Sequence, residues 1–336
     1  MRLRRSDCSV PGLTRHRHRR GFRFHDEHGD PIDDEETLGR VRGLVIQPAW
    51  REVWICPAPD GHIQATGLDE AGRKQYRYHD AWRVRRDAAK FDDMLAFARL
   101  LPALREEVAR ELARGELDRD GVMAVAVRLL DRGFFRVGGE DYAGENGSFG
   151  LATIRREHVT QRGETVVFDY PGKSGKRRLQ AVVDPEVAAA VRTLKRRRGG
   201  GEELLAYKET GPATRWRDVR SEDVNAWLKE RTGQDVSAKE FRTWGATVLA
   251  AVGLAVSGRA NATRSARKRA VTRAVKEVAV YLGNTPAVAR SSYIDPRVID
   301  RFADGQAIDV ATVGEDPGDP AGQVPVERAV LELIEG

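Results

Sequence analysis

Residues 279–296 read Ala279-Val-Tyr-Leu-Gly-Asn-Thr-Pro-Ala-Val-Ala-Arg-Ser-Ser-Tyr-Ile-Asp-Pro296, and they combine a helix end with a helix restart. The Gly283-Asn284 pair is typical of a helix stop, because glycine readily adopts the left-handed conformation that ends many helices. Pro286 favours the first turn of a new helix, where its missing N–H would have no partner in any case. We therefore predict two helices joined by a tight turn, the second of which carries Tyr293.

The charge of the chain is unevenly distributed. The 336 residues are 40% hydrophobic and 32% charged, which is typical of a globular protein with two domains, and the formal net charge is +6. From Asp295 onward there are ten acidic and three basic residues, a net of −7, so the first 294 residues carry about +13. A basic body favours a polyanionic partner such as nucleic acid, although an Arg-rich composition alone would produce the same numbers.

Several classes of protein can be set aside. No apolar run approaches the roughly 20 residues that cross a bilayer, and no apolar segment follows the Arg-rich N-terminus as in a secretory signal. Cys8 and Cys56 are too few for a disulfide framework or a zinc cage, which favours a reducing cytoplasm. Gly172-Lys173-Ser174 resembles the end of a phosphate-binding P-loop, but Val167 stands where that motif needs its first glycine. No Gly-x-Ser-x-Gly elbow is present, so neither an ATP-driven enzyme nor a serine hydrolase is expected.

The N-terminal part of the chain has the pattern of a small β-rich module. Residues 1–20 hold seven arginines against one acid, and we expect a basic arm there. Residues 21–25 alternate apolar and polar side chains, and the turn Pro59-Asp-Gly61 separates two strand-like runs in the manner of a hairpin. The strand pattern continues through 72–79. These signals predict a mostly-β domain over 21–82.

Helical spacing dominates from residue 83. Apolar side chains recur three and four residues apart from Phe91 onward, and Pro102 is expected to bend or divide this helix. The same criteria predict further helices at 121–131, 185–197, 221–231, 239–252 and 264–282, and short strands at 152–155, 165–169 and 179–183. We therefore expect an α+β chain, with a larger α-rich domain over 83–304 that contains a small β-sheet. An acidic tail follows over 305–336, with a last short helix at 326–334.

A set of basic residues can be grouped around Tyr293 on chemical grounds. A phenol with a pKa near ~10 attacks a phosphodiester poorly unless the developing negative charge is neutralised. Two guanidiniums, from Arg136 and Arg242, match the non-bridging oxygens of a phosphate in their fork geometry. A lysine such as Lys173 can donate the proton that a 5′-alkoxide leaving group needs. A covalent phosphotyrosine keeps the energy of the broken bond, so that resealing requires no nucleotide.

At these residues the chain resembles the compact type IB DNA topoisomerases of the poxvirus and bacterial kind. The resemblance runs from about Gly21 to Pro296, and its motifs are specific in this order and spacing rather than singly. The matching motifs are Gly72-Arg-Lys-Gln-Tyr-Arg-Tyr78, Phe134-Phe-Arg-Val-Gly138, Pro171-Gly-Lys173, Lys239-Glu-Phe-Arg-Thr-Trp-Gly245 and Gly283-Asn-Thr-Pro286 with Tyr293 following.

The resemblance implies a role for each matching residue. Tyr293 would be the nucleophile that forms a 3′-phosphotyrosyl link, and Lys173 the general acid to the 5′-oxygen. The residues implied to hold the scissile phosphate or to assist are Arg136, Arg242, Asn284 and Lys239. Viral members carry histidine where this chain has Asn284, whereas bacterial members have asparagine there. A neutral amide can donate a hydrogen bond to a phosphate oxygen but brings no positive charge.

The resemblance also implies how the protein meets its substrate, which would be duplex DNA. The residues implied to contact DNA are Gln75, Tyr76, Tyr78, Tyr142, Arg267 and Lys268. The β-rich domain and a catalytic domain with the fold shared by tyrosine recombinases and type IB topoisomerases would form a C-shaped clamp. The implied enzyme is a cytoplasmic, nucleoid-associated monomer without a membrane segment, which relaxes supercoiled DNA with no ATP, no resident metal ion and no essential Mg²⁺.

Other interpretations exist for these residues. Tyr293 could pack its ring in a core, and Tyr281 is a rival nucleophile that we assign to the core because it falls in an apolar stripe. The arginines could be surface ion-pair partners, and the lysines solvated turn residues. A site-specific tyrosine recombinase would share the chemistry, but it usually has histidine at the position of Lys239 and a helical domain in front. A catalytically silent DNA clamp would not need the Arg, Lys, Arg, Tyr set.

Overall fold

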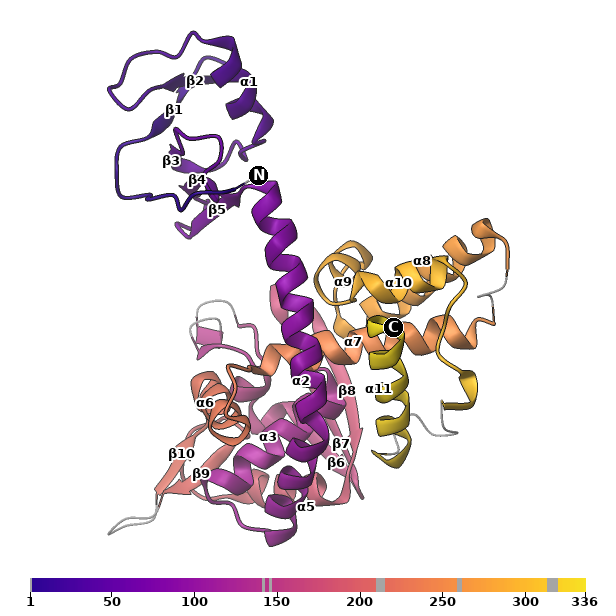
Figure 1. Cartoon of the computed structure of the whole chain (residues 1–336). Coiled ribbons are helices and arrows are strands. Elements are labelled where there is room, and N and C mark those ends of the chain that lie inside the picture. Colours follow the sequence, from indigo (N-terminus) through magenta and orange to yellow (C-terminus); the bar gives the residue numbers. More distant parts are fainter. Residues whose placement is uncertain (1, 141–142, 145–146, 210–214, 259–261, 313–319) are drawn as a thin grey trace. The chain divides into compact units, whose positions relative to one another are not determined.

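The computed structural model describes residues 2–140, 143–144, 147–209, 215–258, 262–312 and 320–336. The chain forms two compact units, Met1–Phe91 and Asp92–Gly336, which are described separately below (Figure 1). The first unit is built around an antiparallel sheet and the second is mostly helical, so the predicted α+β class is confirmed. Within these described residues, no helix is both long and apolar enough to span a membrane.

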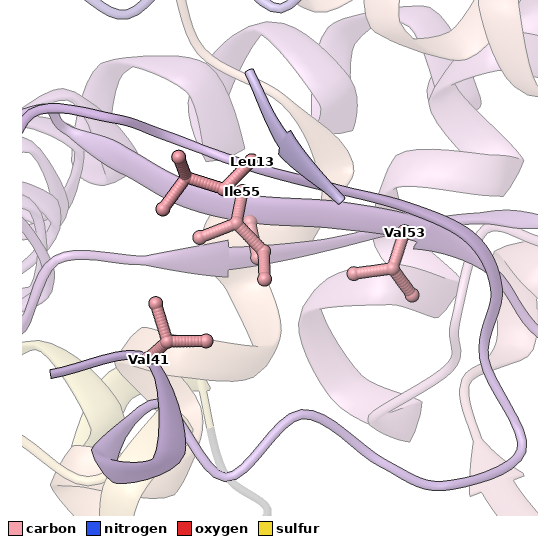
Figure 2. Close-up of a cluster of buried hydrophobic side chains, with 5 residues drawn as sticks. Leu13, Val41, Val53 and Ile55 are labelled. Carbon is pink, nitrogen blue, oxygen red and sulfur yellow. The ribbon is translucent and has the colours of Figure 1, made fainter. Parts of the chain in front are cut away.

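The first unit is a five-stranded antiparallel sheet with the strand order β2-β1-β3-β4-β5, covered by one helix. Its elements are β1 (Leu13–His18), β2 (Gly21–His25), α1 (Glu35–Gly43), β3 (Arg51–Ile55), β4 (Ile63–Leu68) and β5 (Lys74–Tyr78). Figure 2 shows its core, in which Val41 of α1 belongs to one buried cluster with Leu13, Val53 and Ile55 of the strands. Val53 and Ile55 are two residues apart and thus share one face of β3, as the predicted hairpin requires.

The N-terminal residues do not form the separate basic arm that their charge predicts. Leu13–His18 is strand β1, which lies between β2 and β3. Before it, the backbone N–H of Arg4 donates to the carbonyl of Asp60 over 3.0 Å, and that of Ser6 to Nδ1 of His62 over 2.8 Å. Arg15 lies on the same face of β1 as the buried Leu13, and its guanidinium donates to the backbone carbonyls of Ile46 and Trp50 over 3.0 and 2.8 Å. Charge counting does not register such contacts within the unit.

Helix α2 (Asp80–Arg114) begins in the first unit and continues into the second. The domain boundary predicted between residues 82 and 83 falls inside this helix, and the compact units divide after Phe91. Pro102 was expected to bend or divide the helix; it lies inside the continuous helix, so it does not divide it. Leu101 and Leu104 flank the proline and are buried.

The second unit surrounds the buried helix α3 (Arg119–Gly133). The other long helices are α5 (Pro185–Arg196), α6 (Ser221–Thr232), α7 (Ala238–Val256) and α8 (Arg264–Leu282). Shorter helices α9 (Pro286–Ser292) and α10 (Pro296–Ala303) follow α8. Strands β6 (Val159–Arg162), β7 (Thr165–Pro171) and β8 (Arg177–Val183) form an antiparallel sheet in that order, and β9 (Ala206–Glu209) pairs with β10 (Arg215–Asp218). Helix α3 packs against α5, α7, β8 and β9.

One local prediction in this unit is wrong, and one hairpin was not predicted. Residues 152–155 were expected in a strand, but Leu151–Thr153 is a 3-10 helix, η1. The N–H of Leu151 donates to the carbonyl of Arg136, and the hydroxyl of Thr153 accepts from Gly150, so contacts with a distant loop and a local cap decide the conformation. The hairpin of β9 and β10 was not predicted, since its strands are only four residues each.

The C-terminal residues are integrated into the second unit rather than forming a free acidic tail. Helix α11 (Pro320–Glu335) packs against α7 and α10, and Val330 and Ile334 are buried. The buried carboxylate of Glu327 accepts hydrogen bonds from Arg105 over 2.6 and 2.8 Å, and from the indole of Trp244 over 3.0 Å. The predicted helix at 326–334 is confirmed and extended at its N-terminal end.

Candidate active site

Arg242 lies on helix α7, which begins with a capping box. Glu240 accepts hydrogen bonds from the backbone N–H and the hydroxyl of Ser237, over 2.9 and 2.6 Å. Arg242 lies two residues after Glu240 on the same helix, and it is only 3% exposed. Its guanidinium donates to the carbonyl of Phe134 and, over 3.0 Å, to the carbonyl of Leu282. One side chain therefore joins the end of α3 to the end of α8.

The segment after α3 carries Arg136 and has an unusual backbone. Phe134 terminates the helix with a φ of 53°, a left-handed conformation that costs a bulky residue free energy. In this conformation the carbonyl of Phe134 accepts a hydrogen bond from Arg242. Arg136, two residues further on, donates from Nη2 to Oδ1 of Asn284 over 2.5 Å. The two arginines thus approach the same place from different elements.

Gly283 and Asn284 form the joint between α8 and α9, as the sequence predicts. Gly283 has a φ of +61°, and the N–H of Asn284 donates to the carbonyl of Ala279 over 2.9 Å. Thr285 then caps α9, with its hydroxyl 3.3 Å from the N–H of Val288. The side-chain Nδ2 of Asn284 is buried and, within the described residues, makes no hydrogen bond of good geometry, although it lies close enough to the Tyr293 phenol to help lower its pKa. A buried donor without a partner is a candidate contact for a ligand oxygen.

Tyr293 ends helix α9 and faces Arg242. The guanidinium carbon of Arg242 lies 5.3 Å from the centroid of the Tyr293 ring. Thr247 contacts the backbone of Tyr293 and of Asp295. Its hydroxyl lies 3.2 Å from the carbonyl oxygen of Tyr293 and accepts a hydrogen bond from the N–H of Asp295 over 3.1 Å. The carboxylate of Asp295 is fully buried and accepts from Arg297 over 2.7 Å. This set of contacts gives the tyrosine a defined position.

The electrostatics of this site favour negative charge on the tyrosine. Burial alone would raise the pKa of Tyr293, but the charges of Arg242 and Arg136 outweigh it and lower the pKa below its ordinary value. Burial, aided by repulsion from Arg136, lowers the pKa of Arg242 to about 10. Across the described residues, neither Arg136 nor Arg242 forms an ion pair with a carboxylate. A site with two uncompensated guanidiniums is suited to an anion.

The two predicted lysines are not in contact with this cluster. Lys173 is exposed in the 3-10 turn η3 (Lys173–Gly175) between β7 and β8, and Lys239 is exposed on the first turn of α7. The structure brings together Arg136, Arg242, Asn284 and Tyr293. It places Lys173 and Lys239 on the elements that lead into the cluster.

The residues predicted to contact DNA in the first unit divide between two faces of β5. Tyr76 and Tyr78 share one face, with ring centroids 6.0 Å apart, and Tyr76 is exposed. Gln75 alternates to the other face, where its amide donates to Asp69 over 2.9 Å. The tyrosines thus present one surface, whereas Gln75 is engaged in an intramolecular contact.

Of the remaining predicted residues, Lys268 is exposed on α8 and Arg267 is half-buried on the same helix. Tyr142 lies outside the described residues. Tyr281 was assigned to the core, but its side chain is 57% exposed, so this assignment is wrong. Its ring lies beside Phe134 with centroids 6.2 Å apart. Apolar neighbours in sequence do not guarantee burial near a helix end.

Sequence reasoning missed several residues that support the site. Thr247 and Asp295 hold the tyrosine backbone, and Tyr170 is buried behind the cluster with its hydroxyl donating to Gln180 over 2.8 Å. Burial raises the pKa of Tyr170, although nearby arginines oppose the effect. The alternation of buried residues along β7 could have identified Tyr170. In the described ranges, no group of three or more His, Cys, Asp or Glu side chains could hold a metal ion.

Comparison with known families identifies the class of protein to which this fold and site belong. The family model described as eukaryotic DNA topoisomerase I, catalytic core, matches residues 79–307, and that of the bacterial DNA topoisomerase IB N-terminal domain matches residues 21–69. The chain belongs to the type IB DNA topoisomerase family.

The alignments with individual relatives differ in how much of the chain they cover. The protein is 26% identical over 310 residues to DNA topoisomerase 1B of Acanthamoeba polyphaga mimivirus, an alignment that covers 90% of this chain and 92% of the viral protein. It is 19% identical over 269 residues to DNA topoisomerase 1B of vaccinia virus, with 80% of both chains covered. DNA topoisomerase 1 of Daucus carota is 31% identical over 128 residues, which is 38% of this chain but 15% of the plant protein.

Proposed function

We propose that this protein is an ATP-independent type IB topoisomerase that relaxes supercoiled duplex DNA through a transient break in one strand. Family membership supports the reaction class. The observation that carries the proposal is the pair of guanidiniums, from Arg136 and Arg242, that face Tyr293 without a neutralising carboxylate among the described residues. A buried guanidinium from Arg242 and a half-buried one from Arg136 beside the same tyrosine fit a phosphodiester better than any neutral substrate.

In the proposed reaction, the Tyr293 oxygen attacks the scissile phosphorus as a phenolate. The P–O bond to the 5′-oxygen breaks, and Lys173 supplies the proton that this oxygen takes up. The product is a 3′-phosphotyrosyl bond and a free 5′-hydroxyl. Resealing is the reverse: the 5′-hydroxyl returns its proton, attacks phosphorus and expels the tyrosine.

The phosphate would be held by Arg136, Arg242 and Asn284. The guanidiniums bind non-bridging oxygens, and the buried Nδ2 of Asn284 is a donor still available for a phosphate oxygen. The position of Arg136 is set in turn by Oδ1 of the same amide, over 2.5 Å. Lys239 would assist from the first turn of α7, on the same helix as Arg242.

This mechanism requires neither nucleotide nor divalent metal. The covalent intermediate retains the energy of the broken bond, and side chains supply the positive charge that the pentacoordinate transition state requires. We propose that the enzyme acts as a monomer on nucleoid DNA in the cytoplasm, and that both of its units contact the duplex. Tyr76 and Tyr78 on β5 would contact DNA in a groove, and Arg267 and Lys268 on α8 would contact its phosphate backbone.

The alternative, a site-specific tyrosine recombinase, is not favoured. Both family models that match the chain describe topoisomerases, and the first unit is a β-sheet domain rather than a helical one. The lysine at position 239 agrees with this distinction.

Plasmid relaxation tests the proposal directly. Purified protein should relax supercoils of both signs in steps, in EDTA and without ATP. Tyr293→Phe should bind DNA but neither relax it nor become attached to it, whereas Tyr281→Phe should remain active as the matched control. If well-folded wild-type protein relaxes no plasmid at any salt concentration that permits binding, the proposed function is wrong.

A further inference from the structure

Arg178 connects two segments of the site that are far apart in the sequence. It lies near the start of β8, directly after the turn that carries Lys173. From there its guanidinium donates to the carbonyl of Tyr281 over 2.6 Å and to the carbonyl of Val280 over 3.4 Å. These carbonyls belong to the last turn of α8, where a positive charge complements the helix dipole, and that of Val280 also accepts from the N–H of Gly283 over 3.0 Å.

Two glycines enclose the Arg178 side chain, one on each segment. A Cβ atom added to Gly283 would overlap the guanidinium, lying 2.9 Å from Cζ of Arg178. A Cβ atom added to Gly172 would lie 2.7 Å from Cγ of Arg178. Gly172 has a φ of −90°, which other residues adopt without strain, so its lack of a side chain serves the contact with Arg178.

These glycines are the immediate neighbours of two residues of the proposed mechanism. Gly172 precedes Lys173, and Gly283 precedes Asn284. Lys173 itself is exposed, and no contact within the described chain fixes its ammonium group. Its position relative to the phosphate therefore depends on how the turn is attached to the rest of the site.

We propose that Arg178 is a positioning residue, which fastens the turn of Lys173 to the end of α8 and so sets the distance between the lysine ammonium and the scissile phosphate. The inference rests on the proposed function and on the general-acid role proposed for Lys173. Arg178 makes the connection through the two nitrogens of its fork and through its methylene groups, which pack beside Gly172. A lysine would keep the charge but could not make the same pair of contacts.

The test compares two leaving groups in single-turnover cleavage. A strong cleavage position is first mapped on plasmid DNA with the wild-type enzyme, and a duplex around it is made with either oxygen or sulfur at the 5′-bridging atom. A thiolate leaves without protonation, so sulfur restores cleavage only where proton donation is what has been lost. Because a misplacement of ~1 Å can cost on the order of 100-fold, we expect Arg178→Ala and Arg178→Lys to cleave the oxygen duplex roughly 10- to 100-fold more slowly than wild type.

On the sulfur duplex both variants should approach the wild-type rate. The Lys173→Ala, Arg178→Ala double variant should be no slower than Lys173→Ala alone, because both changes remove the same proton transfer. Arg177→Ala is the matched control. It removes the neighbouring arginine, which pairs with Asp169 over 2.7 Å at the surface, and should leave both rates near wild type.

Gly172→Ala extends the test in case Arg178→Ala does not fold. Its added methyl group should displace Arg178 and slow the oxygen duplex in the same way, with rescue by sulfur. The inference is overturned if the variants are slowed equally on both duplexes, if Arg178→Lys cleaves at the wild-type rate, or if the double variant loses the product of both single effects. Wild-type protein that attaches to neither duplex would instead overturn the proposed function, and this inference with it.

Discussion

Replacement of Arg242 by methionine should separate the charge at the site from its shape. Methionine fills much of the same space, but it removes the positive charge that faces Tyr293. The guanidinium carbon lies 5.3 Å from the ring centroid of the tyrosine. At that distance two unit charges attract by about 3 kcal/mol for an effective dielectric constant of ~20. Since ~1.4 kcal/mol corresponds to tenfold in rate, we expect Arg242→Met to slow DNA cleavage by on the order of 100-fold.

The same replacement should change the ionisation of Tyr293 in a stated direction. In the wild type, Arg242 and Arg136 lower the pKa of Tyr293 against the effect of burial. With Arg242 removed, burial remains, and the pKa should rise. As pH increases, the phenolate fraction grows through the pKa, so cleavage by the wild type should level off at a lower pH than cleavage by Arg242→Met.

Two measurements on the same proteins check this reasoning. Single-turnover attachment to a nicked DNA duplex gives the cleavage rate, and tyrosinate absorbance, referred to Tyr293→Phe in each background, gives the pKa. Arg242→Lys is the control: it keeps the charge, and should preserve the lowered pKa while losing rate through the missing fork. A folded Arg242→Met that cleaves as fast as the wild type, or whose Tyr293 pKa stays as low, would refute the electrostatic account.

Three further changes have distinct expected outcomes. Asn284→Ala removes the donor proposed for the phosphate and the acceptor of Arg136, and should slow cleavage by roughly 10- to 100-fold in the single-turnover assay, as for a hydrogen bond to a charged group; an unchanged rate would contradict the role given to this amide. Glu327→Ala breaks a buried ion pair and should lower the free energy of unfolding by about 3–5 kcal/mol in urea titrations, whereas Glu335→Ala, in an exposed pair, should cost less than about 1 kcal/mol. Equal costs would show that α11 is not anchored at its buried carboxylate. Tyr76→Ala should weaken DNA binding a few-fold without changing its salt dependence, because no charge is lost; a changed salt slope would indicate a rearranged interface.

Local sequence signals predicted the parts of the fold that depend on local chemistry. Helix α8 spans the residues expected from its apolar spacing, and ends where Gly283-Asn284 stops it. The sheet of the first unit follows the predicted alternation and hairpin turn. The 3-10 helix at Leu151–Thr153 was read as a strand, since its conformation depends on hydrogen bonds to the carbonyls of Arg136 and Val137. A pattern within four residues carries no information about those partners.

The site shows the same division. Its four clustered residues stand in motifs whose order along the chain already pointed to them, and the stop before Asn284 has a clear local signature. Arg178 has none, because its contacts run from β8 to the end of α8 across about a hundred residues of sequence. Tyr281 was misplaced for a similar reason: the helix periodicity predicts a face, but only the packing of neighbouring elements shows which end of that face is covered.

In the proposed reaction, Tyr293 becomes covalently attached to the 3′-phosphate of a broken DNA strand. The most direct measurement is mass spectrometry of the peptide that remains joined to nucleotide after the protein is trapped on a nicked duplex and digested. We predict a phosphotyrosyl adduct at Tyr293, a free 5′-hydroxyl on the released strand, and no adduct in Tyr293→Phe. Attachment at Tyr281, or through a 5′-phosphate, would contradict this account.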